Sequence, residues 1–97
     1  EVFFDELEVD IDILINNAGL AIVKDIISNL DWADIQTVLN TNINALVKVT
    51  QLCLPFLYKT EGDILNLSSI AGIEGYEGGN IYCCTKAFVK MFSKFTY

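Results

Sequence analysis

The sequence predicts an α/β fold built on a parallel sheet, and three observations support this prediction. Two short apolar runs without alternation, each closed by polar residues or glycine, predict strands over residues 12–18 and 64–68. Such runs are typical of strands that are covered on both faces. Apolar residues at helical spacing predict a long helix from about Trp32 to Tyr58 and a second helix from about Asn80. The order strand, helix, strand, helix favours a parallel sheet with a right-handed crossover.

Local signals predict the connections between these elements. The first residues, up to about Leu7, should end a preceding helix, and residues 20–30 should form a connection with a short helical turn. Asp31 is the expected N-cap of the long helix. The second half of this helix is apolar almost all round, which predicts burial on more than one side, and Pro55 should kink or weaken its last turns. Residues 61–63 are a predicted turn.

Composition narrows the class of protein and the kind of site. Apolar residues make up 53% of the chain, which excludes a disordered chain and predicts surfaces buried against the rest of a larger domain or a partner subunit. A net charge of −7 argues against nucleic-acid binding. Because the chain has no histidine, we expect no His-based triad and no metal site. No apolar run is long enough to predict a membrane span.

Three cysteines, Cys53, Cys83 and Cys84, are predicted to be reduced. Their number is odd, two are adjacent, and none belongs to a CxxC motif. This pattern favours thiols in a cytoplasmic protein over a disulfide framework. We interpret all three as small apolar packing residues.

Residues able to do chemistry gather at one predicted edge of the sheet. Asn17–Gly19 end the first strand, Ser69 follows the second, and Tyr82 and Lys86 open the helix that follows a glycine-rich loop over residues 69–79. In open α/β sheets, ligands bind beyond the carboxyl ends of the strands. The order of these residues along the chain therefore predicts one binding edge.

Tyr82 and Lys86 stand four residues apart and share one face of their helix. A free phenol, with a pKa near ~10, is poorly matched to proton transfer at neutral pH. A lysine cation nearby favours the phenolate, as an acid/base that works near neutrality requires. Ser69 is then placed to hold a carbonyl or hydroxyl oxygen of a substrate while Tyr82 exchanges the proton.

Each piece taken alone also has an ordinary structural explanation. A tyrosine four residues before a solvated lysine is common. Asn16–Gly19 fits a strand-ending turn, Ser69 fits the start of a loop, and Asn42 fits a merely polar helix position. Their order and spacing together favour the chemical interpretation.

Four stretches between about residues 10 and 92 resemble the short-chain dehydrogenases/reductases. Asp12-Ile-Leu-Ile-Asn-Asn-Ala-Gly19 is similar to the family's fourth strand with its NNAG motif, and Asn42 to its helix asparagine. Gly62-Asp-Ile-Leu-Asn-Leu-Ser-Ser-Ile-Ala-Gly72 resembles the fifth strand with its catalytic serine, and Tyr82-Cys-Cys-Thr-Lys86 fits the YxxxK motif. The resemblance implies a partial Rossmann-like, doubly wound parallel sheet, of which this chain is the central β-α-β-α portion.

The resemblance implies a catalytic tetrad of Asn42, Ser69, Tyr82 and Lys86. Ser69 is preferred to Ser68 because the family's serine usually precedes its tyrosine by thirteen positions. In the family the tyrosine is the acid/base, the lysine also binds the nicotinamide ribose, and the asparagine holds a relay water at a helix distortion.

The resemblance also implies a cofactor site within a partial NAD(P)-binding domain over residues 1–97. Asn17, Ala18 and Gly19 would border the cofactor, together with the tyrosine and lysine of the YxxxK motif. Residues 69–76 and 81–88 look most like NADP-dependent 3-hydroxy acid dehydrogenases, which include enzymes acting on serine or allo-threonine. The implied cofactor is NADP, with NAD as the alternative, and the implied substrate is a small hydroxy or keto compound.

The family's dimers and the departures from its pattern set two further expectations. The family builds a four-helix dimer interface from the long helix and the YxxxK helix, which implies a homo-oligomer. The family's first strand with its TGxxxGxG turn and the segment after the YxxxK helix have no counterpart in these 97 residues, and residues 94–97 depart from the usual helix pattern. We therefore expect this chain to hold the catalytic residues of an oxidoreductase but to lack most of the cofactor site. We expect no activity from this chain alone. The competing hypothesis is a truncated, non-catalytic remnant or a dimerisation module.

Overall fold

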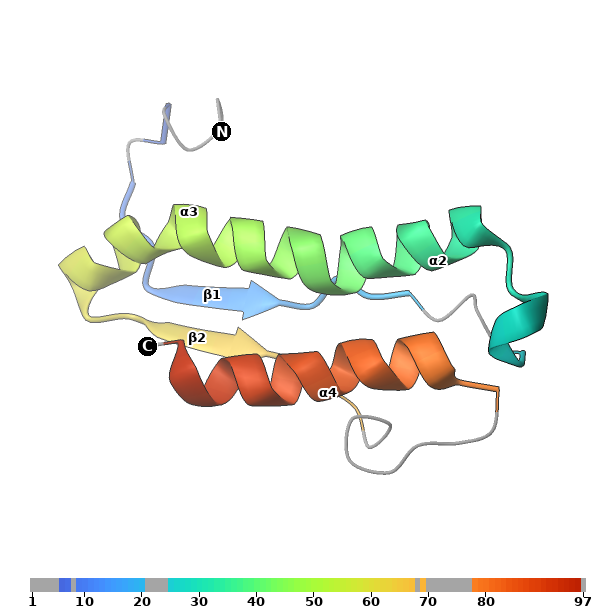
Figure 1. The fold of residues 1–97 in the computed structure, drawn as a ribbon. Coiled ribbons are helices and arrows are strands. Elements are labelled where there is room, and N and C mark those ends of the chain that lie inside the picture. The colour runs from blue at the N-terminus through green and yellow to red at the C-terminus, as the bar shows by residue number, and fades with distance from the viewer. Residues whose placement is uncertain (1–5, 8, 21–24, 68, 70–77, 97) are drawn as a thin grey trace.

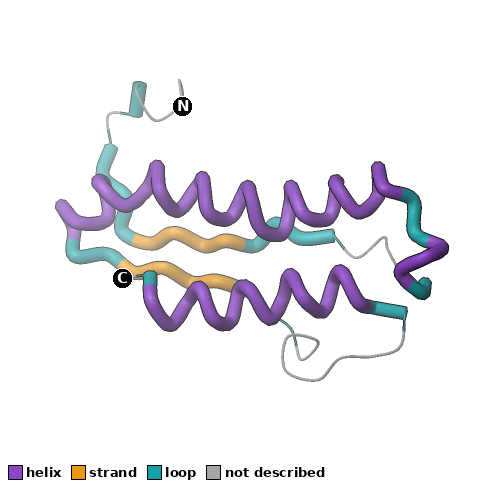
Figure 2. The backbone as a smooth tube through the Cα atoms, viewed as in Figure 1, coloured by secondary structure: helices purple, strands orange, loops and turns teal. Residues whose placement is uncertain are grey.

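The computed structural model describes residues 6–7, 9–20, 25–67, 69 and 78–96. In chain order these residues form strand β1 (Ile13–Asn16), a 3₁₀ turn (Ile27–Asn29), helix α2 (Trp32–Leu39), a π-helical turn (Asn40–Asn44), helix α3 (Ala45–Thr60), strand β2 (Asp63–Asn66) and helix α4 (Asn80–Phe95). Figure 1 shows the two strands side by side, and Figure 2 shows that α2 and α3 form one continuous rod. The predicted α/β order is confirmed.

The strands pair in parallel, with Ile13 opposite Asp63 and Asn16 opposite Asn66. This pairing confirms the predicted parallel sheet. Both strands have four residues, fewer than predicted. Ser68, the predicted last residue of the second strand, lies outside the described residues.

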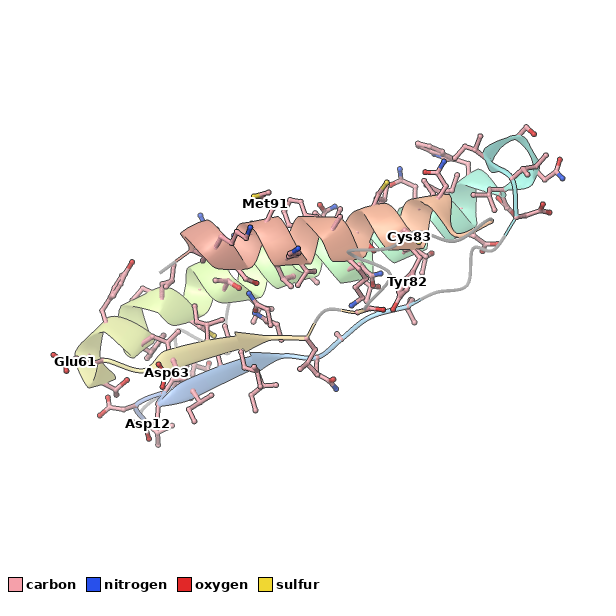
Figure 3. The ribbon with its side chains drawn as sticks, turned by 90° about the horizontal axis from the view of Figure 1, so that it is seen from below. Asp12, Glu61, Asp63, Tyr82, Cys83 and Met91 are labelled. Carbon is pink, nitrogen blue, oxygen red and sulfur yellow. The ribbon has the colours of Figure 1, made fainter. Side chains whose placement is uncertain are left out.

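Within the part of the chain that the structure describes, helices cover one face of this sheet and leave the other open. Figure 3 shows α3 and α4 on the same side of the two strands, and side chains along each strand alternate between half-buried and exposed. On the open face, Ile13, Ile15 and Leu65 are 58%, 57% and 50% exposed. The prediction of strands covered on both faces is therefore wrong within the described part of the chain. A strand sequence without alternation of apolar and polar residues shows that both faces of the strand are apolar, but it does not show what covers those faces.

The long helix begins as predicted and is interrupted in the middle. Asp31 is its N-cap, since its carboxylate accepts a hydrogen bond from the Ala33 N–H at 3.0 Å. The π-helical turn separates α2 from α3, and the helix ends at Thr60, two residues later than predicted. Pro55 lies inside α3 without ending it. Burial on more than one side is wrong for the described residues, because Val47 and Tyr58 are 37% and 64% exposed.

The turn after α3 is shorter than the predicted residues 61–63, because Asp63 already belongs to β2, and it depends on a close approach between two segments. Glu61 adopts the left-handed conformation, with φ of 53°, and the Gly62 N–H donates to the Leu57 carbonyl at 3.0 Å. A Cβ on Gly62 would lie 2.3 Å from the Asp12 carbonyl oxygen, so only glycine fits here. The turn therefore brings β2 directly beside β1.

Helix α4 begins at Asn80 as predicted and ends at Phe95, so the first two of the residues 94–97, Lys94 and Phe95, still belong to the helix. Ile81 packs against a core of Ile35 and Val38, which holds α4 against α2. No helix in the described ranges combines the length and the apolar character needed to cross a membrane.

The two remaining local predictions have mixed outcomes. All three cysteines are free thiols, and Cys53 is buried as predicted. Cys84 is exposed, so its interpretation as a packing residue is wrong. Of the predicted N-terminal helix end, only Glu6 and Leu7 are described, and neither is helical.

Candidate active site

Three of the four polar side chains that are buried in the described part of the chain gather in one place. Asn42, Thr85 and Lys86 are only 1%, 0% and 8% exposed, and they lie where the π-helical turn contacts α4. Burying a lysine costs free energy unless polar groups surround its charge. Groups buried at such a cost are concentrated at functional sites. This cluster is the candidate active site.

The Lys86 ammonium lies between the segments that follow the two strands. Its Nζ donates to the carbonyl oxygen of Leu67, just after β2, over a long distance of 3.4 Å. Gly19, which follows β1, is so close that a Cβ on it would lie 3.1 Å from the same Nζ. The lysine thus reaches the edge of the sheet at which the sequence predicted binding.

Tyr82 and Lys86 are neighbours in space as well as on the helix. Lys86 Nζ lies 5.8 Å from the centroid of the Tyr82 ring, and the tyrosine is half-buried. The structure therefore places the lysine cation near the tyrosine ring, and the proton transfer by Tyr82 stays a prediction. Ser69 is half-buried and follows Leu67 by two residues. Its position relative to the Tyr82 hydroxyl stays a prediction.

Asn42 lies within the π-helical turn and is held by three hydrogen bonds. Its Oδ1 accepts from the Leu20 N–H at 2.8 Å, and its Nδ2 donates to the Leu20 carbonyl at 2.9 Å and to Thr85 Oγ1 at 3.0 Å. Asn42 therefore ties the segment after β1 to α4. Single π-turns within α-helices are frequent at functional sites.

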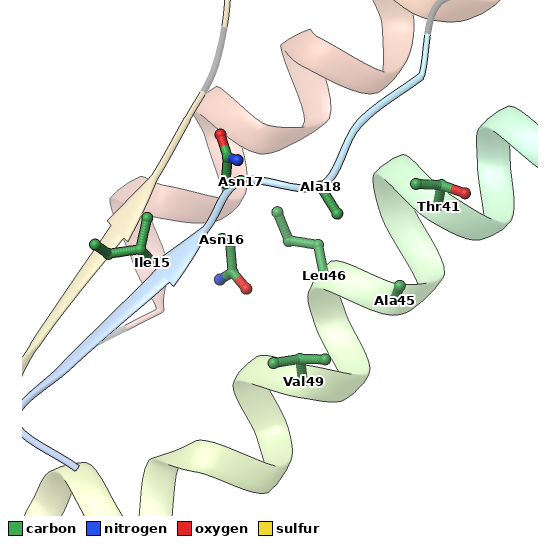
Figure 4. A pocket seen from close by; sticks show the side chains of 8 residues that line it. All are labelled: Ile15, Asn16, Asn17, Ala18, Thr41, Ala45, Leu46 and Val49. Carbon is green, nitrogen blue, oxygen red and sulfur yellow. The ribbon is translucent and has the colours of Figure 1, made fainter.

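Asn17, Ala18 and Gly19 are exposed residues directly after β1. Gly19 contacts the lysine end of the cluster, whereas Asn17 and Ala18 line a different space. This is a cavity of about 240 Å³ between the end of β1 and the helix face from Thr41 to Val49 (Figure 4). None of the four predicted catalytic residues lines this cavity, so it borders the candidate site without containing it.

Comparison with protein families decides the class of this chain. The family model described as short chain dehydrogenase matches residues 4–96. The chain belongs to the short-chain dehydrogenase family. The prediction made from the NNAG, Ser-Ser and YxxxK stretches is confirmed at the level of the family and of its Rossmann-like fold.

Three relatives show which members of the short-chain dehydrogenase family this chain resembles. It is 47% identical over 85 residues to the NADP-dependent 3-hydroxy acid dehydrogenase of Schizosaccharomyces pombe, covering 87% of this chain and 33% of that protein. It is 48% identical over 84 residues to serine 3-dehydrogenase of Agrobacterium fabrum, and the match covers 87% of this chain and 34% of that protein. The crystal structure of serine dehydrogenase from Escherichia coli matches 94% of this chain and 44% of that one, with 39% identity and a TM-score of 0.87. The chain thus spans about a third of the length of its curated relatives.

Sequence reasoning missed two polar links in this short-chain dehydrogenase chain. Thr85, inside the YxxxK motif, was not singled out, although it occupies the centre of the buried cluster. The other link runs across the sheet, where Asn16 Nδ2 donates to Asn66 Oδ1 at 2.7 Å and Asn66 Nδ2 donates to Ser93 Oγ at 2.9 Å. The four-residue spacing of Thr85, Val89 and Ser93 places them on one face of α4, but it does not show which residues meet that face.

Proposed function

We propose that the protein containing this chain is an oxidoreductase that transfers hydride between NADP(H) and a small hydroxy or keto substrate, with a 3-hydroxy acid as the substrate class. The observation that carries this proposal is the buried Lys86 ammonium beside the Tyr82 ring, with Nζ 5.8 Å from the ring centroid. The names of the two curated relatives above support both the cofactor and the substrate class. In this proposal residues 1–97 are part of the NAD(P)-binding domain.

Tyr82 is the acid/base of the proposed reaction. When a carbonyl is reduced, its oxygen gains negative charge, and the Tyr82 hydroxyl donates a proton to it; in the oxidative direction the phenolate takes that proton back. Lys86 brings a positive charge near the ring of this tyrosine, with Nζ 5.8 Å from the ring centroid. Because Lys86 is 8% exposed, water screens its charge less than it would at the surface.

Ser69 and Asn42 support this transfer in different ways. Ser69 donates a hydrogen bond to the same substrate oxygen and stabilises the charge that develops on it. Asn42 keeps the helix distorted at the π-helical turn. Both N–H groups of its amide already donate, to Leu20 and Thr85. A relay water at this point would therefore accept no hydrogen bond from the Asn42 side chain and would depend on main-chain groups of the turn.

The donor set at the sheet edge fits a nicotinamide nucleotide. Bound NADP(H) supplies or accepts the hydride. Lys86 would hold a ribose hydroxyl through its ammonium, since charged N–H donors bind hydroxyl oxygens well. Gly19 has no side chain, which leaves room beside that ammonium, and Asn17 and Ala18 are exposed along the same edge. These residues account for the nicotinamide end of the cofactor site.

The proposal includes a homo-oligomer formed through α3 and α4. Val47 on α3 and Met91 on α4 are exposed apolar side chains, which supports a contact along these helices. Native mass spectrometry of the whole protein tests this point, with a dimer or tetramer expected. Three free thiols fit a reducing compartment, so we place the protein in the cytoplasm.

A second candidate function is a non-catalytic interaction module, and one observation favours it. Ile13, Ile15 and Leu65 form an exposed apolar row on the sheet. Large exposed apolar patches mark surfaces that contact other protein. The coding sequence upstream of Glu1 separates the candidates: a glycine-rich strand-to-helix turn favours the enzyme, and a start codon close by favours the module.

The proposed function is tested by titrating the whole protein with NADPH and NADH and then following absorbance at the nicotinamide band with a panel of 3-hydroxy acids. We expect tighter binding of NADPH and reduction of NADP with serine or a related 3-hydroxy acid. The 97-residue chain serves as the comparison and should neither bind NADPH tightly nor turn over substrate. Turnover with no panel member, in a folded whole protein that binds NADPH, would overturn the substrate class.

A further inference from the structure

We propose that Thr85 is a positioning residue that locks the Asn42 amide and the first turns of α4 into one arrangement, and this inference rests on the proposed function above. Thr85 is fully buried. Its hydroxyl accepts a hydrogen bond from Asn42 Nδ2 at 3.0 Å and donates one to the Tyr82 carbonyl at 2.7 Å. One hydroxyl thus joins the π-helical turn to the main chain of the proposed acid/base.

The direction of these hydrogen bonds follows from the backbone of Leu20. The Leu20 N–H can only donate, so it must face Asn42 Oδ1, and the Leu20 carbonyl can only accept, so it must face Asn42 Nδ2. A flipped amide would place two donors together and two acceptors together. The second N–H of Nδ2 therefore points to Thr85, whose hydroxyl must accept it and has its own hydrogen left for Tyr82.

A simpler explanation is that Thr85 only bonds back to its own helix, as helical hydroxyls often do. Thr37 shows that ordinary case, since its hydroxyl donates to the Ala33 carbonyl at 2.9 Å on an exposed surface. Thr85 differs because it is fully buried and because a side chain 43 residues away donates to it. Its loss would leave a buried amide N–H of Asn42 without this acceptor.

The position of Thr85 links its hydrogen bonds to the placement of Tyr82 and Lys86. Thr85 directly precedes Lys86, and it bonds to the main chain of Tyr82. Asn42 in turn holds Leu20, the neighbour of Gly19, against which the lysine ammonium lies. A shift of Thr85 therefore changes how the tyrosine and the lysine meet the edge of the sheet, although Thr85 itself touches no reacting atom.

The test compares Thr85→Val with Thr50→Val in the whole protein. Thr50 is a matched control, because it is 1% exposed and its hydroxyl also accepts from an asparagine amide, Asn16 Nδ2 at 3.1 Å, but on α3 away from the cluster. We expect Thr85→Val to lower kcat by roughly tenfold to a hundredfold, with a much smaller change in KM, because small displacements of catalytic groups are that costly. Thr50→Val should keep kcat, and Thr85→Ser should restore it.

A readout that needs no activity decides the inference independently. In NMR spectra of the folded protein, the Asn42 side-chain amide protons should exchange slowly with solvent in the unsubstituted protein, in Thr85→Ser and in Thr50→Val, and faster in Thr85→Val. Equal exchange in both valine variants, or an equal loss of kcat in both, would overturn the proposal. If Thr85→Val does not fold, Thr85→Cys, with a weak sulfur acceptor, takes its place. A protein without reductase activity would refute the proposed function, while the exchange data would still decide the role of Thr85.

Discussion

Gly19 and Lys86 are in contact: a Cβ added to the glycine would lie 3.1 Å from the lysine Nζ and 3.6 Å from Asn42 Oδ1. The glycine follows β1, and the lysine belongs to α4. Their contact joins two segments that are far apart in the sequence. It also shows why the last residue of the NNAG stretch is a glycine, because any side chain here would press on the ammonium.

We predict that Gly19→Ala lowers activity without unfolding the protein. The Lys86 side chain is flexible, so its Nζ can move by a few tenths of an ångström, but that displaces the charge from its place beside Tyr82. We expect kcat/KM to fall by roughly tenfold while the melting temperature changes little.

Gly62→Ala is the control for this prediction. A Cβ at Gly62 would lie 2.3 Å from the main-chain oxygen of Asp12, which cannot move away easily. This variant should lose folding stability, as measured by urea unfolding. If Gly19→Ala instead lowers stability as much as Gly62→Ala and keeps its kcat/KM per folded molecule, the proposed role of the Gly19 contact is wrong.

Lys86→Ala should lower activity. The substitution removes a buried ammonium whose Nζ lies 5.8 Å from the Tyr82 ring centroid and which is proposed to hold a ribose hydroxyl of the cofactor. Lys90→Ala is the control, because Lys90 is exposed one turn later on the same helix. The kcat and KM values of both variants give the answer, and a Lys86→Ala protein with the kcat/KM of Lys90→Ala would remove the lysine from the mechanism.

Much of the fold follows from the sequence, because local rules decide it. Asp31 is the N-cap, α4 begins at Asn80, and β1 and β2 pair in parallel, as predicted. The exposure of Ile13 and Ile15 was not predictable in the same way. Periodicity shows that a side chain is apolar, but what covers it depends on segments elsewhere in a fold.

The candidate site likewise contains residues that the sequence predicts and one residue that only the structure reveals. Tyr82, Lys86 and Asn42 follow from motifs, and in the structure Lys86 lies near the Tyr82 ring, while Gly19 lies beside both Lys86 and Asn42. Thr85 does not follow from them, because a threonine in a helix is ordinarily a surface residue and only the fold reveals that Asn42 donates to it. The register between two helices that are distant in sequence has no local signal.

Burial of Cys53 predicts a specific pH dependence of stability. Burial raises the pKa of the Cys53 thiol above its ordinary value. Above about pH 8.5 the unfolded chain therefore releases a proton that the folded chain keeps, so stability is complete below that pH and falls as the pH rises through it. Urea unfolding between pH 7 and pH 10 should show a loss of stability that is smaller in Cys53→Ala.

The exposed Cys84 supplies the control for this effect. Cys84→Ala should leave the pH dependence unchanged, and a thiol reagent should label Cys84 in the native protein long before it labels Cys53. Rapid labelling of Cys53 under native conditions would contradict its burial.

The open face of the sheet predicts how the 97-residue chain behaves alone. Ile13, Ile15 and Leu65 are at least half exposed there, and both outer edges of the pair β1–β2 lack a neighbouring strand among the described residues. We expect this chain to bind the dye ANS and to self-associate at micromolar concentration. Ile15→Thr should weaken the dye fluorescence more than Val47→Thr on α3, and equal effects would contradict the open face.

Tyr82→Phe tests the central claim most directly. The substitution removes one oxygen atom from a half-buried ring whose centroid lies 5.8 Å from Lys86 Nζ, so the fold and NADPH binding should remain. In the whole protein, kcat should fall by roughly a hundredfold to ten-thousandfold, which is the usual contribution of a general acid/base. A Tyr82→Phe protein that binds NADPH and keeps the unsubstituted kcat would contradict the account.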